Sequence, residues 1–419
     1  MKSCPDSKRA EESTQANDAL AECQMPTAST ADILIIGLGA VGSAALYQAA
    51  SRKLRVIGID RFAPPHDQGS SHGETRITRQ AIGEGREFVP LVLRSDELWR
   101  DLEAQSGRAL VNHCGCLVLA SPDMPGRHHG STSFLQDTID AARQFSIAHE
   151  LLSTGELQRR FPQLRLIAGE AGYLESGAGF LRPEACIAAQ IELARKAGAQ
   201  ICFDETVQRV ATSAGGAEVE TTRATYSAAH VIVTAGAWIP KLLGQKYARL
   251  FRIYRQTLCW FALESHQDRY APAHFPVFIW ITGNRPRDML YGFPAVDGPS
   301  GGVKIATEQY DATVDPDAVP REVTDSEVAA LHAEYIAPRF PDVSSRSLRS
   351  TTCLYTVTPD AKFIVDRFLE SDNGWFASAC SGHGFKHSPA IGEALVRRAL
   401  GEPALVDLSM FSLRRFGLG

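Results

Sequence analysis

A long apolar run is the first feature that the sequence lacks. No segment reaches the roughly eighteen consecutive apolar residues that a helix needs to cross a bilayer, and residues 1–30 mix acidic with basic side chains without an apolar stretch. Such a segment is not typical of a secretory signal or a transit peptide. We therefore expect a disordered tail over residues 1–30, followed by a soluble protein that does not enter a membrane.

The cysteine pattern of a metal or disulfide scaffold and a strong excess of charge are also lacking. The 419 residues include nine cysteines, without the paired spacing of a zinc site or the density of a disulfide-rich secreted domain. This scatter favours a reducing, cytoplasmic location and gives no reason to expect a bound metal. The net charge of -5 provides no general attraction to phosphate backbones, so nucleic acid is not an expected partner.

The amino-acid composition is typical of a protein with a large hydrophobic core. Hydrophobic residues make up 44% of the chain and charged residues 22%, which is typical of globular proteins, and the length favours two domains. An apolar strand at 31–36, a helix at 41–50 and a second strand at 55–60 predict a βαβ unit. Further helices are predicted at 88–102, 183–197 and 389–400.

Other strands divide into two kinds. Apolar segments at 198–209, 230–236 and 375–379 resemble the first unit, whereas 251–309 alternates short aromatic and β-branched runs with Pro, Gly and Asn, which is typical of antiparallel strands. We therefore predict an α/β fold in which a Rossmann-like nucleotide-binding domain is interleaved with a substrate domain built on a mixed, largely antiparallel sheet. The expected stretches are 31–112, 173–245 and 340–419 for the first domain, and 113–172 and 246–339 for the second.

The sequence GLGAVG at 37–42 is a dinucleotide-binding motif in its full context. It follows a strand and opens a helix. Gly37, Gly39 and Gly42 suit a tight turn, close approach to a pyrophosphate and helix packing, and Asp60 at the end of the next strand can accept from ribose hydroxyls. The motif does not distinguish NAD from FAD.

A basic cluster follows at residues 69–79. If this segment is helical, His72, Arg76 and Arg79 lie on one face at spacings of four and three. Such a face could bind a carboxylate or a negatively charged reduced ring. It could equally be a solvated basic face paired with nearby glutamates.

Two later segments also combine reactive and flexible residues. Residues 351–360 read as a strand, on which Cys353 and Tyr355 face the same side; taken alone, a cysteine there is more often a buried apolar residue. The loop 380–386 connects a strand to a helix, so its glycines can approach a ligand and Lys386 can project into a cleft. A flexible connection is the alternative.

These motifs, in this order, resemble the family of monomeric sarcosine oxidase, N-methyltryptophan oxidase and pipecolate oxidase, within the D-amino-acid-oxidase-like flavoproteins. The resemblance runs from about residue 31 to residue 416. Its motifs are GLGAVG at 37–42, PPH at 64–66, GSSHGETR at 69–76, GEGREFVPL at 83–91, YGFP at 291–294, CLYT at 353–356 and SGHGFK at 381–386.

The resemblance implies a cofactor and a set of site residues. FAD replaces NAD as the expected cofactor, with Cys353 at the position that bonds the flavin 8α carbon. Arg79 and Lys386 match the pair that holds the substrate carboxylate, and Lys304 matches the lysine that activates oxygen. The matches to residues around the flavin and beside the substrate are His72, Thr75, Arg76, Tyr291 and Tyr355. The other expected FAD contacts are Gly37, Gly39, Gly42, Asp60, Ser71, Val207, Gly382, Gly384, Phe385 and again Lys386.

One position departs from the family pattern. Several relatives carry a histidine four residues after the lysine, where this chain has Glu308. On a strand, Lys304 and Glu308 face the same side. The carboxylate could therefore pair with the lysine or meet a polar group of the substrate.

The resemblance implies an FAD-dependent oxidase of a secondary-amine amino acid, such as sarcosine or N-methyltryptophan. An imine forms first, and its hydrolysis gives an amino acid and an aldehyde, while molecular oxygen becomes hydrogen peroxide. A monomer is expected. The alternatives are a dehydrogenase that passes electrons from similar amines to a carrier, and a non-catalytic FAD scaffold protein.

Overall fold

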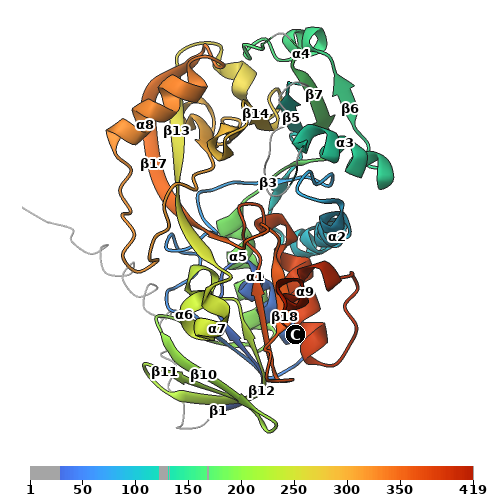
Figure 1. Cartoon of the computed structure of the whole chain (residues 1–419), viewed down its shortest axis with the longest axis vertical. Coiled ribbons are helices and arrows are strands. Elements are labelled where there is room, and N and C mark those ends of the chain that lie inside the picture. Colours follow the sequence, from blue (N-terminus) through green and yellow to red (C-terminus); the bar gives the residue numbers. More distant parts are fainter. Residues whose placement is uncertain (1–28, 122–130, 132, 168, 419) are drawn as a thin grey trace, which may run out of the picture.

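A computed structural model describes residues 29–121, 131, 133–167 and 169–418 of the protein (Figure 1). Most of the expected tail, residues 1–28, lies outside these residues, and the first strand, β1, already begins at Ser29. Within the described ranges, no helix is both long and apolar enough to cross a membrane. The fold has two large sheets, one in the lower and one in the upper half of Figure 1.

The lower sheet contains the βαβ unit. Its order is β10-β11-β12-β1-β2-β9, and β12 also pairs with β19, which pairs with β18. Strands β2, β9, β12 and β19 continue the sheet in parallel from β1, as the motif requires. The bounds are β1 (Ser29–Ile36), β2 (Val56–Ile59), β9 (Gln200–Cys202), β10 (Val207–Ser213), β11 (Gly216–Thr221), β12 (Thr225–Val233), β18 (Ile364–Arg367) and β19 (Gly374–Ser378).

Burial explains why β1 is a central strand. Ile33 and Ile35 pack into one apolar cluster, whereas Leu34 and Ile36 pack into another on the opposite face, so a continuous apolar run is buried on both sides. Helix α1 packs against α5 and α9, and α9 also contacts α2. The four predicted helices are confirmed within a few residues, as α1 (Ala40–Ser51), α2 (Val89–Ser106), α5 (Pro183–Lys196) and α9 (Ser388–Ala399).

The upper sheet confirms the expected mixed, largely antiparallel architecture. Its order is β17-β13-β16-β15-β14-β5-β7-β6, and only the β14–β5 pair is parallel. Helices α3 (Phe134–Gln144), α4 (Thr154–Arg160) and α8 (Asp325–Leu331) contact it. The strands are β5 (Cys116–Ala120), β6 (Glu150–Leu152), β7 (Ala171–Glu175), β13 (Arg252–Leu263), β14 (Val277–Ile281), β15 (Met289–Phe293), β16 (Val303–Thr307) and β17 (Val343–Val357).

Strands β13 and β17 lie side by side over their whole length and extend from the upper half of the molecule toward the lower (Figure 1). Strand β17 pairs in the upper sheet although it falls in the stretch 340–419 expected for the nucleotide-binding domain. Most of β7 likewise falls in 173–245 and pairs with β5. Sheet membership therefore differs from the expected stretches at these strands, and the division into domains stays a prediction.

The prediction of a helix over residues 69–79 is wrong, because part of this segment belongs to a small third sheet. Residues 69–75 form turns, and β3 (Arg76–Thr78) pairs with β8 (Gly179–Leu181), which also pairs with β4 (Val111–Asn112). Gly73 and Glu74 have φ angles of 91° and 68°. This left-handed backbone cannot continue a right-handed helix, so the helical face of basic residues does not exist.

Two short helices come after β12 in the chain and contact each other. They are α6 (Ile239–Leu243) and α7 (Gln245–Ala248).

Candidate active site

A cavity of about 400 Å³ brings residues of the two large sheets together. Its size is within the range typical of small-molecule sites. It is lined by the turn before α1, the end of β2, residues of β13, β15, β16 and β17, and the loop that leads to α9. All the candidate site residues line it except Gly42 and His72.

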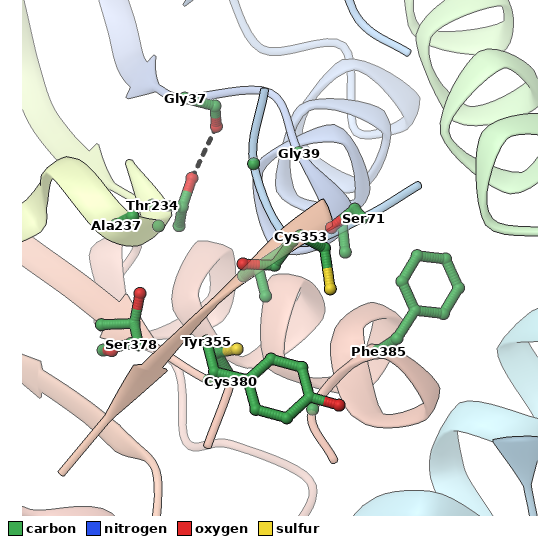
Figure 2. Close-up of a pocket in the computed structure, with 18 of the residues that line it drawn as sticks. Gly37, Gly39, Ser71, Thr234, Ala237, Cys353, Tyr355, Ser378, Cys380 and Phe385 are labelled. Carbon is green, nitrogen blue, oxygen red and sulfur yellow. Dashed lines mark hydrogen bonds between the residues drawn. The ribbon is translucent and has the colours of Figure 1, made fainter. Parts of the chain in front are cut away.

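The glycines of the first motif have separate physical roles. Gly37 has a φ of 83°, and a Cβ there would lie 2.7 Å from the carbonyl oxygen of Thr234. The Thr234 hydroxyl donates to the Gly37 carbonyl oxygen at 2.7 Å (Figure 2), which fixes the turn against the end of β12. At Gly42 a Cβ would lie 1.7 Å from the Gly37 oxygen. Gly42 therefore permits helix packing and need not touch a ligand.

Gly39 is different, because the protein itself does not require a glycine there. The nearest atom to a Cβ at Gly39 would be the Ser71 Oγ, 3.9 Å away, and both residues line the cavity. The open space lies at the N-terminus of α1, where backbone N–H groups and the helix dipole favour an anion. This arrangement fits the pyrophosphate of a dinucleotide.

Asp60 holds a fixed position at the end of β2. One carboxylate oxygen accepts from the Leu38 backbone N–H at 2.6 Å and the other accepts from Phe62 N–H at 2.8 Å. The buried carboxylate lines the cavity, as does Val207 at the start of β10. A carboxylate at this place in a βαβ unit suits a ribose hydroxyl, so the residues present fit the FAD that the motifs imply.

Cys353 lies on β17 at the cavity wall and is 1% exposed. The Leu354 N–H donates to the Gly69 carbonyl oxygen at 3.2 Å, and the Ser70 hydroxyl donates to the Leu354 carbonyl oxygen. These contacts hold the 69–70 segment against the strand, and Figure 2 shows Cys353 and Ser71 among the residues that line the pocket. Burial raises the pKa of the Cys353 thiol, while the nearby charge of Arg76 acts in the opposite direction.

Lys304 is buried beside residues 73–75, with 2% of its surface exposed. Its ammonium donates to the Gly73 carbonyl oxygen at 2.7 Å and to the backbone and hydroxyl oxygens of Thr75 at 3.1 Å each. It lies 4.6 Å from the ring centre of Phe293 and 5.2 Å from that of Trp260. Burial lowers the pKa of Lys304 well below its usual range.

These contacts bear on the two alternatives for Glu308. An ammonium has three N–H donors, and the acceptors around Lys304 are enough to occupy all three. Glu308 lines the cavity and accepts from the Tyr310 hydroxyl at 2.8 Å. These contacts place the Lys304 ammonium against the 73–75 backbone, and a contact between Glu308 and the substrate stays a prediction.

Arg79 and Lys386 place two cationic side chains in the cavity wall. Arg79 is almost fully buried, donates to Glu84 at 2.5 Å, and also donates to the Ala81 carbonyl oxygen. The Lys386 ammonium donates to the His383 carbonyl oxygen at 2.7 Å. Burial lowers the pKa of Lys386 to about 8. Each cation retains N–H donors beyond these bonds, which suits the binding of a carboxylate.

Two phenols complete this part of the wall. The hydroxyls of Tyr291 on β15 and Tyr355 on β17 lie 3.4 Å apart. Burial raises the pKa of both phenols, so both are neutral in the physiological range. The two strands are separated by β16 and β13 in the sheet order, so the pairing depends on side chains that project over the sheet.

Arg76 and His72 lie differently with respect to the cavity. Arg76 lines it and donates to the carbonyl oxygens of Ser70 at 2.7 Å and Thr75 at 2.8 Å. His72 is buried but does not line it, and burial lowers the pKa of its imidazole to about 4. His72 is thus a neutral, buried residue of the 69–75 segment, and its direct role at the flavin stays a prediction.

Sequence reasoning did not select several residues that line the cavity. Thr234 follows a strand that the sequence did predict, and the glycine after it was the available signal. Leu258, Ile279 and Met289 are apolar residues of three different strands or their ends, and no sequence signal distinguishes them from core residues. The other unselected residues include Ala235, Gly236, Trp238, Phe293, Thr356, Ser378 and Cys380.

Most of the chain is similar to named amino-acid oxidases. It is 35% identical over 387 residues to the monomeric sarcosine oxidase of Streptomyces avermitilis, covering 92% of this chain and 98% of that one. It is also 35% identical over 389 residues to the N-methyl-L-tryptophan oxidase of Yersinia pestis, covering 92% of this chain and 99% of that one.

Solved structures agree on the fold. The amino acid oxidase NikD matches with a TM-score of 0.78 at 23% identity, covering 92% of this chain and 97% of that one. Glycine oxidase from Geobacillus kaustophilus matches with a TM-score of 0.72 at 20% identity, covering 92% and 98%. The family model described as DAO, FAD dependent oxidoreductase, matches residues 32–398. The chain therefore belongs to this family of FAD-dependent oxidoreductases.

Proposed function

We propose that the protein is an FAD-dependent oxidase of secondary-amine amino acids, in particular N-methyl amino acids such as sarcosine or N-methyltryptophan. The observation that carries the proposal is the pair Arg79 and Lys386, two buried cations that face one cavity together with the dinucleotide turn. A protein that only stored or displayed FAD would not need a buried carboxylate clamp. The oxidase names of the 35% identical relatives support the same reaction class.

The clamp determines how the substrate is oriented. Arg79 and Lys386 donate to the substrate carboxylate, and burial strengthens these charge-assisted contacts. Glu84 holds the Arg79 guanidinium in place through its ion pair. Because the carboxylate is anchored, the amine and its N–C–H bond are restricted to one region of the cavity, which replaces a random encounter by a fixed orientation.

The remaining wall excludes water and holds positive charge. The neutral Tyr291 and Tyr355 supply an aromatic surface without a competing anion. FAD, when bound, supplies the acceptor for the hydride equivalent removed from the substrate. The oxygens of Gly73 and Thr75 accept from the Lys304 ammonium and thereby oppose the effect of burial on its charge. In this proposal Lys304 and Arg76 both place positive charge in the cavity, where it favours the negative charge that develops during reduction and reaction with oxygen.

The finer features of the proposal concern the cofactor linkage and the products. Cys353 is the residue that we propose forms a thioether with the flavin 8α carbon, since it is a cavity-lining cysteine within electrostatic range of Arg76. Oxygen is the proposed electron acceptor and is converted to hydrogen peroxide. We further propose a cytoplasmic monomer.

The test uses the purified holoenzyme with a panel of N-methyl and cyclic amino acids and the matching amines without a carboxylate. We expect anaerobic bleaching of the flavin and aerobic peroxide release with N-methyl amino acids, and poor reaction of the decarboxylated amines. Lys386→Met is the control that should weaken the preference for the carboxylate. Flavin reduction without oxygen uptake would identify a dehydrogenase instead, and no reduction by any amine would identify a scaffold protein.

A further inference from the structure

Glu308 adds a negative charge to the part of the cavity that holds Lys386, Tyr291 and Tyr355. It follows directly after β16, lines the cavity and is 5% exposed. Its charge is felt by Lys386, Tyr291 and Tyr355, which are all part of the proposed substrate site. The carboxylate therefore lies within electrostatic range of the bound substrate.

Neighbouring residues hold Glu308 in a defined position. The Gln309 N–H donates to the Gln256 side-chain oxygen at 2.8 Å, and the Gln256 amide donates back to the Gln309 carbonyl oxygen at 2.6 Å. The Tyr310 hydroxyl donates to Oε2 of Glu308 at 2.8 Å, and its ring packs edge-on against Tyr254 at 5.3 Å. A carboxylate supported in this way can distinguish ligands by charge.

The group that Glu308 meets is not the reacting amine. Hydride removal requires a neutral amine, and a carboxylate in contact with that amine would favour the unreactive ammonium form. A productive contact is therefore made by another part of the substrate.

We propose that Glu308 is a specificity-determining residue that selects N-methyl amino acids with a cationic side chain and disfavours those with a second carboxylate. The inference rests on the proposed function, because Arg79 and Lys386 must hold the α-carboxylate. A substrate with an anionic group at the clamp and a cationic group at Glu308 then matches both charged parts of the wall. A second carboxylate at Glu308 is repelled in a site from which water is largely excluded.

The test compares Nα-methyl-lysine, Nα-methyl-norleucine and Nα-methyl-glutamate, which have side chains of similar length and different charge. Anaerobic stopped-flow reduction of the holoenzyme flavin gives a dissociation constant and a limiting rate for each. We expect wild-type protein to favour the lysine over the norleucine derivative on the order of 10- to 100-fold in the ratio of rate to dissociation constant. The glutamate derivative should be the poorest of the three.

Two variants test whether the charge of Glu308 causes the substrate preference. Glu308→Gln keeps the size of the side chain and removes its charge, so the lysine-to-glutamate preference should fall at least tenfold. Tyr310→Phe removes the phenol donor but retains the carboxylate, so the sign of the preference should persist. Flavin content and the thermal midpoint establish that each variant is folded and loaded.

The outcomes separate this inference from the proposed function. If the norleucine derivative reduces the flavin but wild-type protein does not prefer lysine over glutamate, the role of Glu308 is wrong and the oxidase proposal stands. An equal lysine-to-glutamate preference in wild-type protein and Glu308→Gln would also show that the role of Glu308 is wrong, while the oxidase proposal stands. If neither this series nor sarcosine reduces the flavin, the proposed function fails and the inference fails with it.

Discussion

Raising the pH through 8 should weaken substrate binding, because Lys386 then loses its charge. Burial lowers the pKa of this ammonium to about 8, against the opposing effect of Glu84. Arg79 also lowers it, whereas Cys116 and Glu308 raise it. Since Arg79 remains charged at every accessible pH, Lys386 is the part of the carboxylate clamp that titrates.

The expected size follows from the pKa. About 90% of Lys386 is charged at pH 7 and about 10% at pH 9, so the dissociation constant should rise by about tenfold between them if only the charged form binds the carboxylate. Because the charged form of Lys386 binds the carboxylate, the affinity for the substrate is highest below the pKa of Lys386 and falls as the pH rises through that pKa. Substitution by methionine should cost a charge-assisted contact of about 1.5–3 kcal/mol at pH 7.

Anaerobic stopped-flow reduction measures this effect, since its dependence on substrate concentration separates binding from the rate at saturation. Lys386→Met should bind weakly at both pH values, and Lys386→Arg should keep its charge at pH 9. Deprotonation of the substrate amine affects all three proteins alike. A ratio of the wild-type to the Lys386→Arg dissociation constant that does not rise from pH 7 to 9, or an equal change in wild-type protein and Lys386→Met, would refute the assignment.

Three further predictions concern the cofactor and oxygen. Flavin should remain attached to acid-precipitated wild-type protein and be released from Cys353→Ser, as absorbance of the pellet and supernatant would reveal; release from both would exclude a thioether. Lys304→Met should slow reoxidation of the reduced enzyme by orders of magnitude and substrate reduction comparatively little, because the substitution removes a buried positive charge; equal slowing in stopped-flow traces would contradict this. Gly39→Ala should preserve the thermal midpoint of the apoprotein, since the nearest atom to the new Cβ is 3.9 Å away, but weaken FAD binding measured by fluorescence titration; unchanged FAD affinity would show that no ligand approaches Gly39.

Local sequence patterns were sufficient for the parts of the fold that depend on periodicity. The apolar run before Gly37 predicted a doubly buried strand, because a polar residue at any of positions 33–36 would face a core. The alternation of a strand likewise placed Cys353 and Tyr355 on one side, and both line the cavity. The family motifs then supplied the candidate residues, and nearly all of them meet at one site.

Tertiary structure decided the conformations that depend on distant partners. The segment 69–75 is not a helix, because the Glu184 carboxylate accepts from the backbone N–H groups of Gly73 at 2.6 Å and Glu74 at 3.0 Å. Glu184 lies more than 100 positions away from both residues in the chain. The acceptors that surround Lys304 come from the same segment. No local pattern encodes such contacts, since a backbone with positive φ becomes stable only when the partner that binds its N–H groups is brought to it by the fold.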